Sequence, residues 1–189
     1  MKDVYQNCPV FENEFYYLRQ VKKQDRDDLL KVYSDRKAVC FFNSDNCGGD
    51  DFYYMSEQRM QEAIEYWDFE YQRGGFVRWT ILSKASKEAI GTIELFHRDA
   101  TDYFTNCGLL RLDLRSDYEK TEEIVKILDL ILKPTYSLFD CDKIATKAIH
   151  EATERIKALK ALGFHYTDEK LIGHDGTEYD SYFVRSSRS

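Results

Sequence analysis

The sequence predicts a mixed α/β (α+β) fold, in which about four helices flank one twisted, mixed sheet of about seven strands. Segments rich in β-branched and aromatic residues alternate with segments whose apolar residues recur at helical spacing. The stretch Gly108–Ile149 has the order strand, helix, strand, which predicts a parallel pair with a right-handed crossover. The chain has only two prolines and nine glycines and no evident repeat or linker, so residues 1–189 are interpreted as a single domain.

Each element of the first half follows from a local signal. Aromatic and β-branched runs predict strands, and Asp or Ser before an apolar helical period predicts a helix N-cap. A Gly-Gly pair predicts a helix end. The predicted elements are a strand at Phe15–Val21, a helix capped by Asp25 that runs to about Ala38, a loop at 40–54, a helix capped by Ser56 and ended by Gly74–Gly75, and a hairpin of strands 76–82 and 88–96.

The second half is predicted in the same way. A proline inside a helical pattern removes one helical hydrogen bond, so Pro134 is expected to kink or end its helix. Asp-Gly is a strong hairpin signal, so Asp175–Gly176 is expected to join the last two strands. The predicted elements are a strand at Gly108–Leu114, a helix carrying Ile124, Ile127, Leu128 and Ile131, a strand at Lys143–Ile149, a helix at about Glu151–Leu162 followed by Gly163 as its C′ residue, and the closing hairpin.

Composition excludes several classes of protein. Hydrophobic residues make up 43% of the chain and aromatic residues 15%, which indicates a folded globular protein rather than a disordered one. The formal net charge is -7, so nucleic acid and anionic membrane are not expected as partners, because both favour basic surfaces. No stretch reaches membrane-spanning length. A cationic substrate or a basic protein segment fits the charge better.

The cysteines and histidines indicate no metal site. Five cysteines are scattered along the chain without a C-x-x-C pair, and the four histidines do not supply short ligand spacing. An odd number of scattered cysteines favours free thiols in a reducing cytoplasm.

Three pieces of the sequence together carry a resemblance. They are EAIGTIELF at Glu88–Phe96, IKALKALGF at Ile156–Phe164 and HDGTEYDSYFV at His174–Val184. In this order and spacing the chain resembles the GNAT acetyltransferase superfamily, and within it the ribosomal-protein N-acetyltransferase-like branch, over nearly its whole length. The resemblance implies acetyl-coenzyme A as donor and an amine as acceptor, either a small molecule or a protein N-terminus. It also implies that cofactor contacts come from Leu112, Leu114, Arg115, Lys120, Thr121 and Glu122.

The coenzyme A motif of that family is degenerate in this chain. The family pattern Gln/Arg-x-x-Gly-x-Gly/Ala falls on residues 119–124, where Glu119 takes the first position, Glu122 the glycine position and Ile124 the last small position. The late helix also departs, since Ala152 and Arg155 stand where the family often has Asn and Ser. Acids in a first helical turn favour the helix dipole, which explains their presence without explaining how a diphosphate binds.

The electrostatic consequence depends on where Glu122 points. A carboxylate about 6 Å from a phosphate charge, at an effective dielectric constant of about 20, costs about 3 kcal/mol. If Glu122 faces solvent, salt and water screen most of that repulsion. If it faces inward, affinity for acetyl-coenzyme A is expected to be poor and Glu122→Gly is expected to improve it.

Glu94 and Asp113 are the candidate catalytic residues. Glu94 lies in a predicted central strand among apolar neighbours, so a raised pKa would let it act as the base that deprotonates the amine. The alternative for Glu94 is an exposed strand end or a salt bridge. Asp113 ends a strand where, by the resemblance, substrate and thioester meet. Its alternative is an ion pair with Arg111, two residues away on the same face.

Two functions remain open on the sequence. One is an active N-acetyltransferase, including a version that holds the cofactor mainly through backbone contacts at Leu112–Arg115. The other is a catalytically inactive GNAT-fold binding or regulatory module that has lost the pyrophosphate site. An enzyme needs a cleft between its fourth and fifth strands, predicted here to be bounded by Leu112–Arg115, Lys120–Glu122 and Lys143–Thr146.

Two further features bear on the acceptor and the assembly. The loop at 40–54 mixes aromatic residues with Asp45, Asp50 and Asp51, so it is either a lid for a cationic amine or a plain surface loop with anchoring aromatics. The C-terminal strands could pair across a homodimer.

Overall fold

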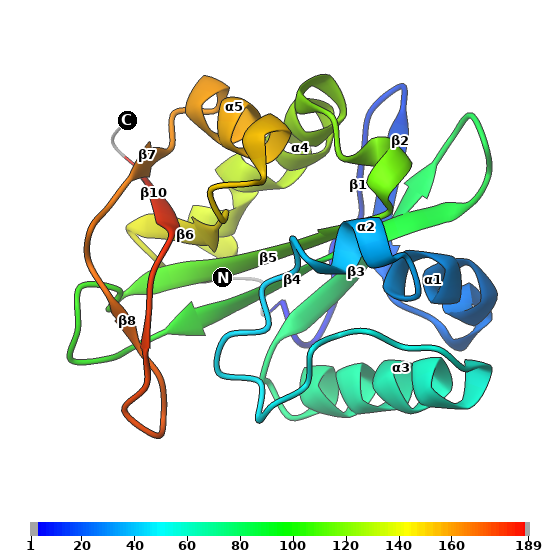
Figure 1. Ribbon diagram of the computed structural model, residues 1–189, viewed down its shortest axis with the longest axis horizontal. Coiled ribbons are helices and arrows are strands. Elements are labelled where there is room, and N and C mark those ends of the chain that lie inside the picture. Colours follow the sequence, from blue (N-terminus) through cyan, green and yellow to red (C-terminus); the bar gives the residue numbers. More distant parts are fainter. Residues whose placement is uncertain (1–3, 188–189) are drawn as a thin grey trace.

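The computed structural model describes residues 4–187, and the fold is a mixed sheet with helices on both faces (Figure 1). The main sheet has eight strands in the order β1-β2-β3-β4-β5-β6-β10-β7, and β8 and β9 form a separate two-stranded sheet. The strands are β1 Phe11–Glu12, β2 Tyr16–Gln20, β3 Val77–Ser83, β4 Ala89–Arg98, β5 Cys107–Leu114, β6 Lys143–Lys147, β7 His165–Tyr166, β8 Leu171–Ile172, β9 Glu178–Tyr179 and β10 Tyr182–Ser186. The helices are α1 Arg26–Tyr33, α2 Arg36–Val39, α3 Glu57–Gln72, α4 Thr121–Leu138 and α5 Thr153–Ala161.

Strand pairing confirms the predicted parallel unit. β5 and β6 are parallel and α4 connects them, whereas the other pairs of the main sheet are antiparallel. The register places Arg78, Glu94 and Arg111 opposite one another across β3, β4 and β5. Because side chains alternate between the two faces of a strand, this row lies on one face while Leu110, Leu112 and Leu114 lie on the other.

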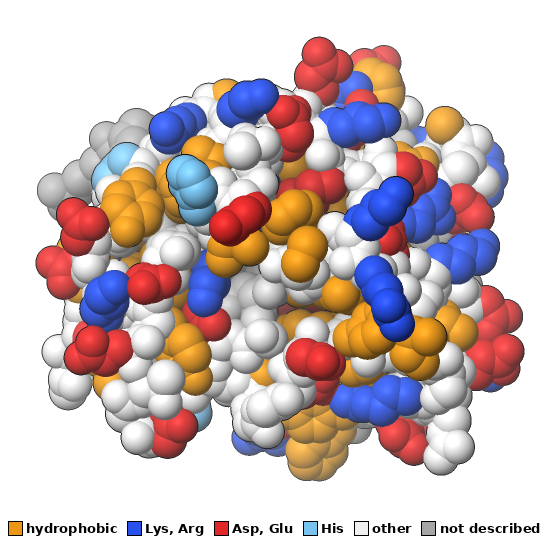
Figure 2. Space-filling model, viewed as in Figure 1, with side chains coloured by type: hydrophobic (Ala, Val, Ile, Leu, Met, Phe, Trp, Pro, Cys, Tyr) orange, Lys and Arg blue, Asp and Glu red, His pale blue; other side chains and the backbone are white. Residues whose placement is uncertain are grey.

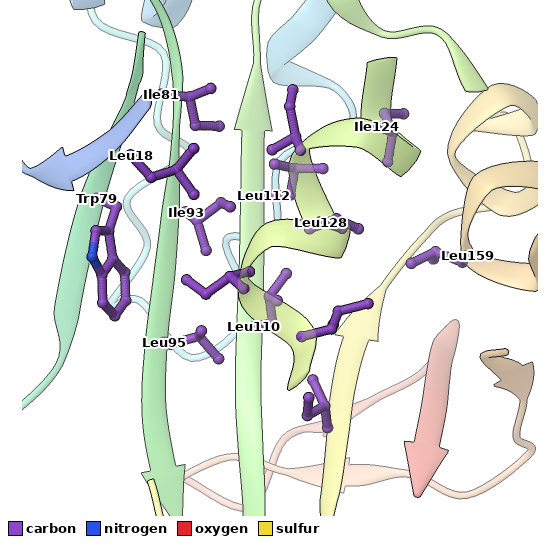
Figure 3. Packing of buried hydrophobic residues seen from close by; sticks show 14 of the residues in the cluster. Leu18, Trp79, Ile81, Ile93, Leu95, Leu110, Leu112, Ile124, Leu128 and Leu159 are labelled. Atoms are coloured by element: carbon purple, nitrogen blue, oxygen red, sulfur yellow. The ribbon is translucent and has the colours of Figure 1, made fainter. Parts of the chain in front are cut away.

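Two apolar clusters cover the two faces of the sheet. On one face, α4 and α5 pack against the strands, and Figure 3 shows Leu110, Leu112, Ile124, Leu128 and Leu159 pointing into this core. On the other face, α1 and α3 enclose a second cluster that includes Tyr33, Met60 and Trp67. Ile124, which takes the last small position of the degenerate motif, is fully buried in the first core.

Three predictions are confirmed only in part. Asp25 takes the N-cap position of α1, but its carboxylate binds Arg19 and Thr80 instead of capping, and the helix ends at Tyr33 before Asp35 caps the separate helix α2. Pro134 does not end α4, which continues to Leu138, since a proline removes only one hydrogen bond and Thr135 is fully buried in the packed last turn. The expected hairpin around Asp175–Gly176 forms as β8–β9, but it is a short pair outside the main sheet.

Other local predictions are confirmed. The Ser56 side chain accepts a hydrogen bond from the Arg59 N–H at the start of α3. Gly163 follows α5 with φ 84°, a left-handed conformation that favours glycine at a helix end. Among residues 4–187 no helix is long and apolar enough to cross a membrane, and all five cysteines are free thiols.

Candidate active site

The parting of β5 and β6 defines the first half of the candidate site. The two strands pair through four residues each, from Cys107 with Lys143 to Leu110 with Thr146. β6 ends at Lys147, while β5 continues to Leu114 and keeps its pairing with β4 on the other side. A gap in the strand pairing therefore opens beyond Leu110, as expected for a cleft, but Lys143–Thr146 is hydrogen-bonded to β5 and does not bound it.

Arg155 of α5 fills this gap. Its Nη1 donates to the carbonyl of Leu112 at 2.8 Å and to the carbonyl of Phe41 at 3.0 Å. Its Nε and Nη2 donate to the two carboxylate oxygens of Glu119, both at 2.7 Å. Both side chains of this bidentate ion pair are buried. Two departures from the family motif, Glu119 and Arg155, are therefore partners in space.

A second acid occupies the N-terminus of α4. The Glu154 carboxylate accepts a hydrogen bond from the Thr121 backbone N–H at 3.2 Å and from the Thr121 hydroxyl at 2.6 Å. Hydrogen bonds from Lys157 and from Thr121 lower the pKa of Glu154 to about 2, so it is an anion at neutral pH. A helix N-terminus is a natural site for an anion, and here the chain supplies its own.

Among the residues expected to hold the cofactor, Lys120 and Glu122 are exposed, and the side chains of the others have partners within the chain. Leu112 and Leu114 bury their side chains in the core under α4. The Arg115 guanidinium pairs with Asp117 at 2.8 Å and with Glu88 at 3.3 Å. The backbone N–H and the hydroxyl of Thr121 bind Glu154, and Glu122 is exposed. The inward orientation considered for Glu122 is therefore wrong, and the bulk in the cleft comes from Arg155.

A pocket on the opposite face of the sheet is the second half of the candidate site. We call it the α3 pocket; its volume is about 920 Å³. Its walls come from α3, the sheet, the loop at 45–54, residues 73–76, residues 97–102 and residues 171–174. The lining residues used below are Trp67 and Glu70 of α3, Phe76, and Arg78, Glu94, Phe96, Arg111 and Tyr182 of the sheet. On the face of the molecule shown in Figure 2, acidic and basic side chains are interspersed.

Two arginines and one glutamate form the floor of the α3 pocket. Arg78 pairs with one carboxylate oxygen of Glu94, and Arg111 pairs with the other at 2.7 Å. Burial alone would raise the pKa of Glu94, but the charges and hydrogen bonds of the two arginines outweigh burial and lower it. The raised pKa expected for a general base is therefore wrong for Glu94, and the salt-bridge alternative describes its geometry.

Asp113 lies behind that floor. Its Oδ2 accepts hydrogen bonds from the Tyr33 hydroxyl at 2.7 Å and from Arg78 at 3.0 Å. The expected pair with Arg111 does not form, because the register directs Arg111 to Glu94. Burial raises the pKa of Asp113, which Arg78 and Tyr33 only partly offset. The structure therefore brings Glu94 and Asp113 together around Arg78, and only Glu94 lines the pocket.

The loop acids that face the pocket are already paired. Asp45 accepts from Lys147 at 2.7 Å and from the Tyr182 hydroxyl at 3.1 Å. Asp50 accepts from Arg59 at 2.6 Å, and the Arg59 guanidinium lies 4.3 Å from the ring centre of Tyr54. The loop therefore lines the pocket, but these two carboxylates are paired with the chain's own cations, and a lid role toward a cationic amine stays a prediction.

This loop also connects the two halves of the site. The carbonyl of Phe41 accepts a hydrogen bond from Arg155 in the gap, and the carbonyl of Asp45 accepts one from Arg111 at the pocket floor, at 2.8 Å. Movement of residues 41–45 would therefore disturb the gap and the pocket together.

Comparison with solved structures defines the class of fold. The chain has the fold of the GNAT acetyltransferases, and ribosomal-protein acetyltransferases are among the similar structures. No model of a protein family matches the sequence, and a search of curated proteins finds no match.

Three of the similar structures show the extent of the likeness. A GNAT-family acetyltransferase from Bacillus anthracis is 10% identical with a TM-score of 0.69, and the match covers 96% of this chain and all of that one, 100%. RimL, a ribosomal α-N-protein acetyltransferase in complex with coenzyme A, is 11% identical with a TM-score of 0.70, covering 94% of this chain and 98% of that one. A ribosomal-protein-alanine acetyltransferase from Vibrio fischeri is 15% identical with a TM-score of 0.64, covering 95% and 97%. At these identities the likeness establishes the fold.

Sequence reasoning missed the contacts of four residues at the candidate site, Arg78, Glu119, Glu154 and Arg155. Arg78 is a charged residue within the apolar run FVRWTIL, and that signal could have placed it at a buried ion-pair site. Glu119 and Arg155 were recognised separately as departures from a pattern. Their opposite charges could have suggested a pair, whereas the role of Glu154 left no signal in the sequence.

Proposed function

We propose that the protein is an N-acyltransferase that acts on an amine, with the acceptor entering through the α3 pocket. The observation that carries this proposal is the parting of β5 and β6 beyond Leu110 and Thr146. A fold with no further use for a cleft could pair these strands along their full length and gain backbone hydrogen bonds. The gap is instead kept and filled by one side chain, which can rotate out without rebuilding the sheet.

The gap does not fit acetyl-coenzyme A in the arrangement described here. Arg155 binds the carbonyl of Leu112, and Glu154 takes the N–H of Thr121 at the start of α4. Glu122 and Ile124 replace the small residues that let a diphosphate approach the backbone. We therefore derive no transfer step through the cofactor, and the proposal requires Arg155 to leave the gap before a donor enters.

A binding or regulatory module is the second candidate function, and the ion pair of Arg155 with Glu119 favours it. A buried bidentate pair that also satisfies two backbone carbonyls is a structural link, and breaking such a link is costly. On this alternative the chain has closed its donor site permanently and uses the α3 pocket alone.

Titration with acetyl-coenzyme A separates the two candidates. The informative variant is Glu119→Gln/Arg155→Ser, which returns both positions to residues that the family pattern implies and removes the ion pair without leaving an unpaired charge. Glu122→Gln is the matched control, because it removes one acid from the same turn at an exposed position. Calorimetry should show weak binding by the wild type, at least about tenfold tighter binding by the double variant, and no change for the control.

The outcomes exclude one candidate each. Binding by the wild type, together with release of coenzyme A in the presence of an amine, supports the acyltransferase, whereas binding by the double variant alone supports a donor site that the ion pair has closed. If neither the wild type nor the folded double variant binds acetyl-coenzyme A, the acyltransferase proposal is rejected and the binding module takes its place. The five free thiols accord with action in the cytoplasm, and a protein N-terminus or a small amine would serve as acceptor.

A further inference from the structure

Arg111 is the least satisfied charge at the floor of the α3 pocket. The Glu94 carboxylate is shared by the guanidinium groups of Arg78 and Arg111, and Arg78 has a second carboxylate partner in Asp113, with 3.0 Å between Nη1 and Oδ2. The Arg78 side chain is 1% exposed and the Arg111 side chain 9%. Because Arg111 has only a shared counter-ion and lies beside the cavity, it favours an anionic ligand.

The hydrogen bonds of the two arginines are also incomplete. Arg111 gives Nη1 to Glu94 and Nη2 to the carbonyl of Asp45. The Nε–H groups of Arg78 and Arg111 are both buried and have no hydrogen-bond partner among residues 4–187. A buried donor without a partner carries a desolvation cost that a ligand oxygen can relieve. Arg111 is the more exposed of the two and is the group that a ligand would reach.

The other charges around the pocket cancel in pairs. Asp45 pairs with Lys147, Asp50 with Arg59, Glu70 with Arg73, and Asp102 with Arg98. Asp99 lies beside His97, and its side chain is 78% exposed, so it is not a buried counter-ion for the floor. Asp113 lies behind the floor, pairs with Arg78 rather than with Arg111, and does not line the pocket.

Aromatic side chains surround this positive floor. Trp67 lies beneath the Arg78 guanidinium, with 4.2 Å between the guanidinium carbon and the ring centre, and Phe76 lies 5.8 Å away. Phe96 lies 5.6 Å from the Arg111 guanidinium carbon. These three rings also line the cavity, so they offer an apolar surface next to the cationic one.

We propose that the α3 pocket binds a carboxylate-bearing small molecule, with the carboxylate at Arg111 and an apolar or aromatic body against Trp67, Phe76 and Phe96. This inference deepens the proposed function and rests on it, because the acceptor would then be an amine that also carries a carboxylate, as an amino acid does. A nearby guanidinium disfavours a second positive charge, so the same floor would favour the neutral form of the acceptor amine, which is the nucleophilic one.

Matched probes test the sign of the ligand. 3-Phenylpropionate and 3-phenylpropylamine share one aromatic body and differ in the charged group. Calorimetry on the wild-type protein should show saturable binding of the carboxylate, with at least about tenfold weaker binding of the amine, because one unit of charge changes sign near the floor. Quenching of tryptophan fluorescence shows where the probe binds, because Trp67 lines the pocket whereas Trp79 is buried in the cluster under α4. Quenching should persist in Trp79→Phe.

Two variants move the floor charge in opposite directions. Glu94→Gln makes the floor more positive and should tighten 3-phenylpropionate binding by about tenfold. Arg111→Gln makes it less positive and should abolish that binding. Circular dichroism melts check that each variant is folded. If Arg111→Gln does not fold, Glu94→Gln still decides, because tightening cannot arise from damage to the fold.

The results that overturn the inference differ from those that overturn the acyltransferase. Preferential binding of 3-phenylpropylamine, no binding of either probe, or weaker carboxylate binding by folded Glu94→Gln each rejects a carboxylate site. None of these measurements needs an acyl donor. Failure of acetyl-coenzyme A to bind therefore leaves a positive carboxylate result standing, and acetyl transfer without carboxylate binding rejects this inference alone.

Discussion

Two candidate binding regions adjoin β5, namely the gap between β5 and β6 and the α3 pocket. They differ in how completely their polar groups are satisfied by the chain itself. In the gap, the Arg155 guanidinium donates hydrogen bonds to Glu119 and to the carbonyls of Leu112 and Phe41. In the pocket, Arg111 shares its one carboxylate partner, Glu94, with Arg78 and leaves its Nε–H without a partner, beside a cavity of about 920 Å³. The comparison teaches that a binding site is recognised by polar groups that lack partners. In the gap between β5 and β6, where a donor would bind, the chain's own side chains already satisfy those groups.

The largest expected effect comes from breaking the completed side. Arg155→Ala leaves the Glu119 carboxylate buried without its partner, which should reduce the free energy of unfolding by about 3 to 5 kcal/mol. The double variant Glu119→Ala/Arg155→Ala should recover much of that loss, because no unpaired charge remains. Urea denaturation of the four proteins in the cycle measures both quantities. Additive losses would show that the two side chains do not act as a pair.

The two carboxyl groups around Arg78 should make the free energy of unfolding depend on pH. The pKa of Glu94 is lowered on folding, so its stabilisation is present above pH 4.5, the ordinary pKa, and is lost as the pH falls through the folded value. The pKa of Asp113 is raised, so its contribution is present below pH 3.8 and is lost as the pH rises through the folded value. We therefore expect the two variants Glu94→Gln and Asp113→Asn to change the pH dependence of the unfolding free energy in opposite directions relative to the wild type, measured from pH 3 to pH 7. Equal changes in slope would contradict the assignment.

Thiol reactivity tests how closed the pocket wall is. Burial raises the pKa of Cys47, which lines the pocket, to about 11, so at pH 8 only on the order of 0.1% of it is thiolate. Cys40 is exposed and should react with a maleimide at least about tenfold faster. Mass spectrometry after timed labelling gives the order of modification, and Cys40→Ser serves as the control. Early labelling of Cys47 would mean that the loop at 45–54 opens readily.

The smallest effect is expected at Glu122. Because this side chain is exposed, Glu122→Gln should change the free energy of unfolding by less than about 0.5 kcal/mol. For the same reason Glu122→Gly should not restore affinity for acetyl-coenzyme A while Arg155 holds the gap. A clear gain in affinity for acetyl-coenzyme A on changing Glu122 alone would show that the missing motif glycine, and not Arg155, limits binding. That result would contradict the contrast drawn between the gap and the α3 pocket.

Much of the fold could be predicted because its signals are local. Ser56 at the start of α3, Gly163 after α5 and the alternation within EAIGTIELF each act over a few residues. The break between α1 and α2 was missed because the apolar period continues across it while Asp35 caps a new helix. For the candidate site, Glu94 and Asp113 were named as candidate acids, but their partners Arg78 and Tyr33 were not.

The sequence by itself determined the order of helices and strands, the parallel β5–β6 unit and the departure of residues 119–124 from a phosphate-binding motif. Only the tertiary structure decided what those departures mean. Residues 119 and 155 are separated by a helix and a strand, and the register of β3, β4 and β5 sets Arg78 and Arg111 on either side of Glu94. Periodicity and capping act between neighbours along the chain, whereas the sign and balance of a buried charge depend on groups that only folding brings together.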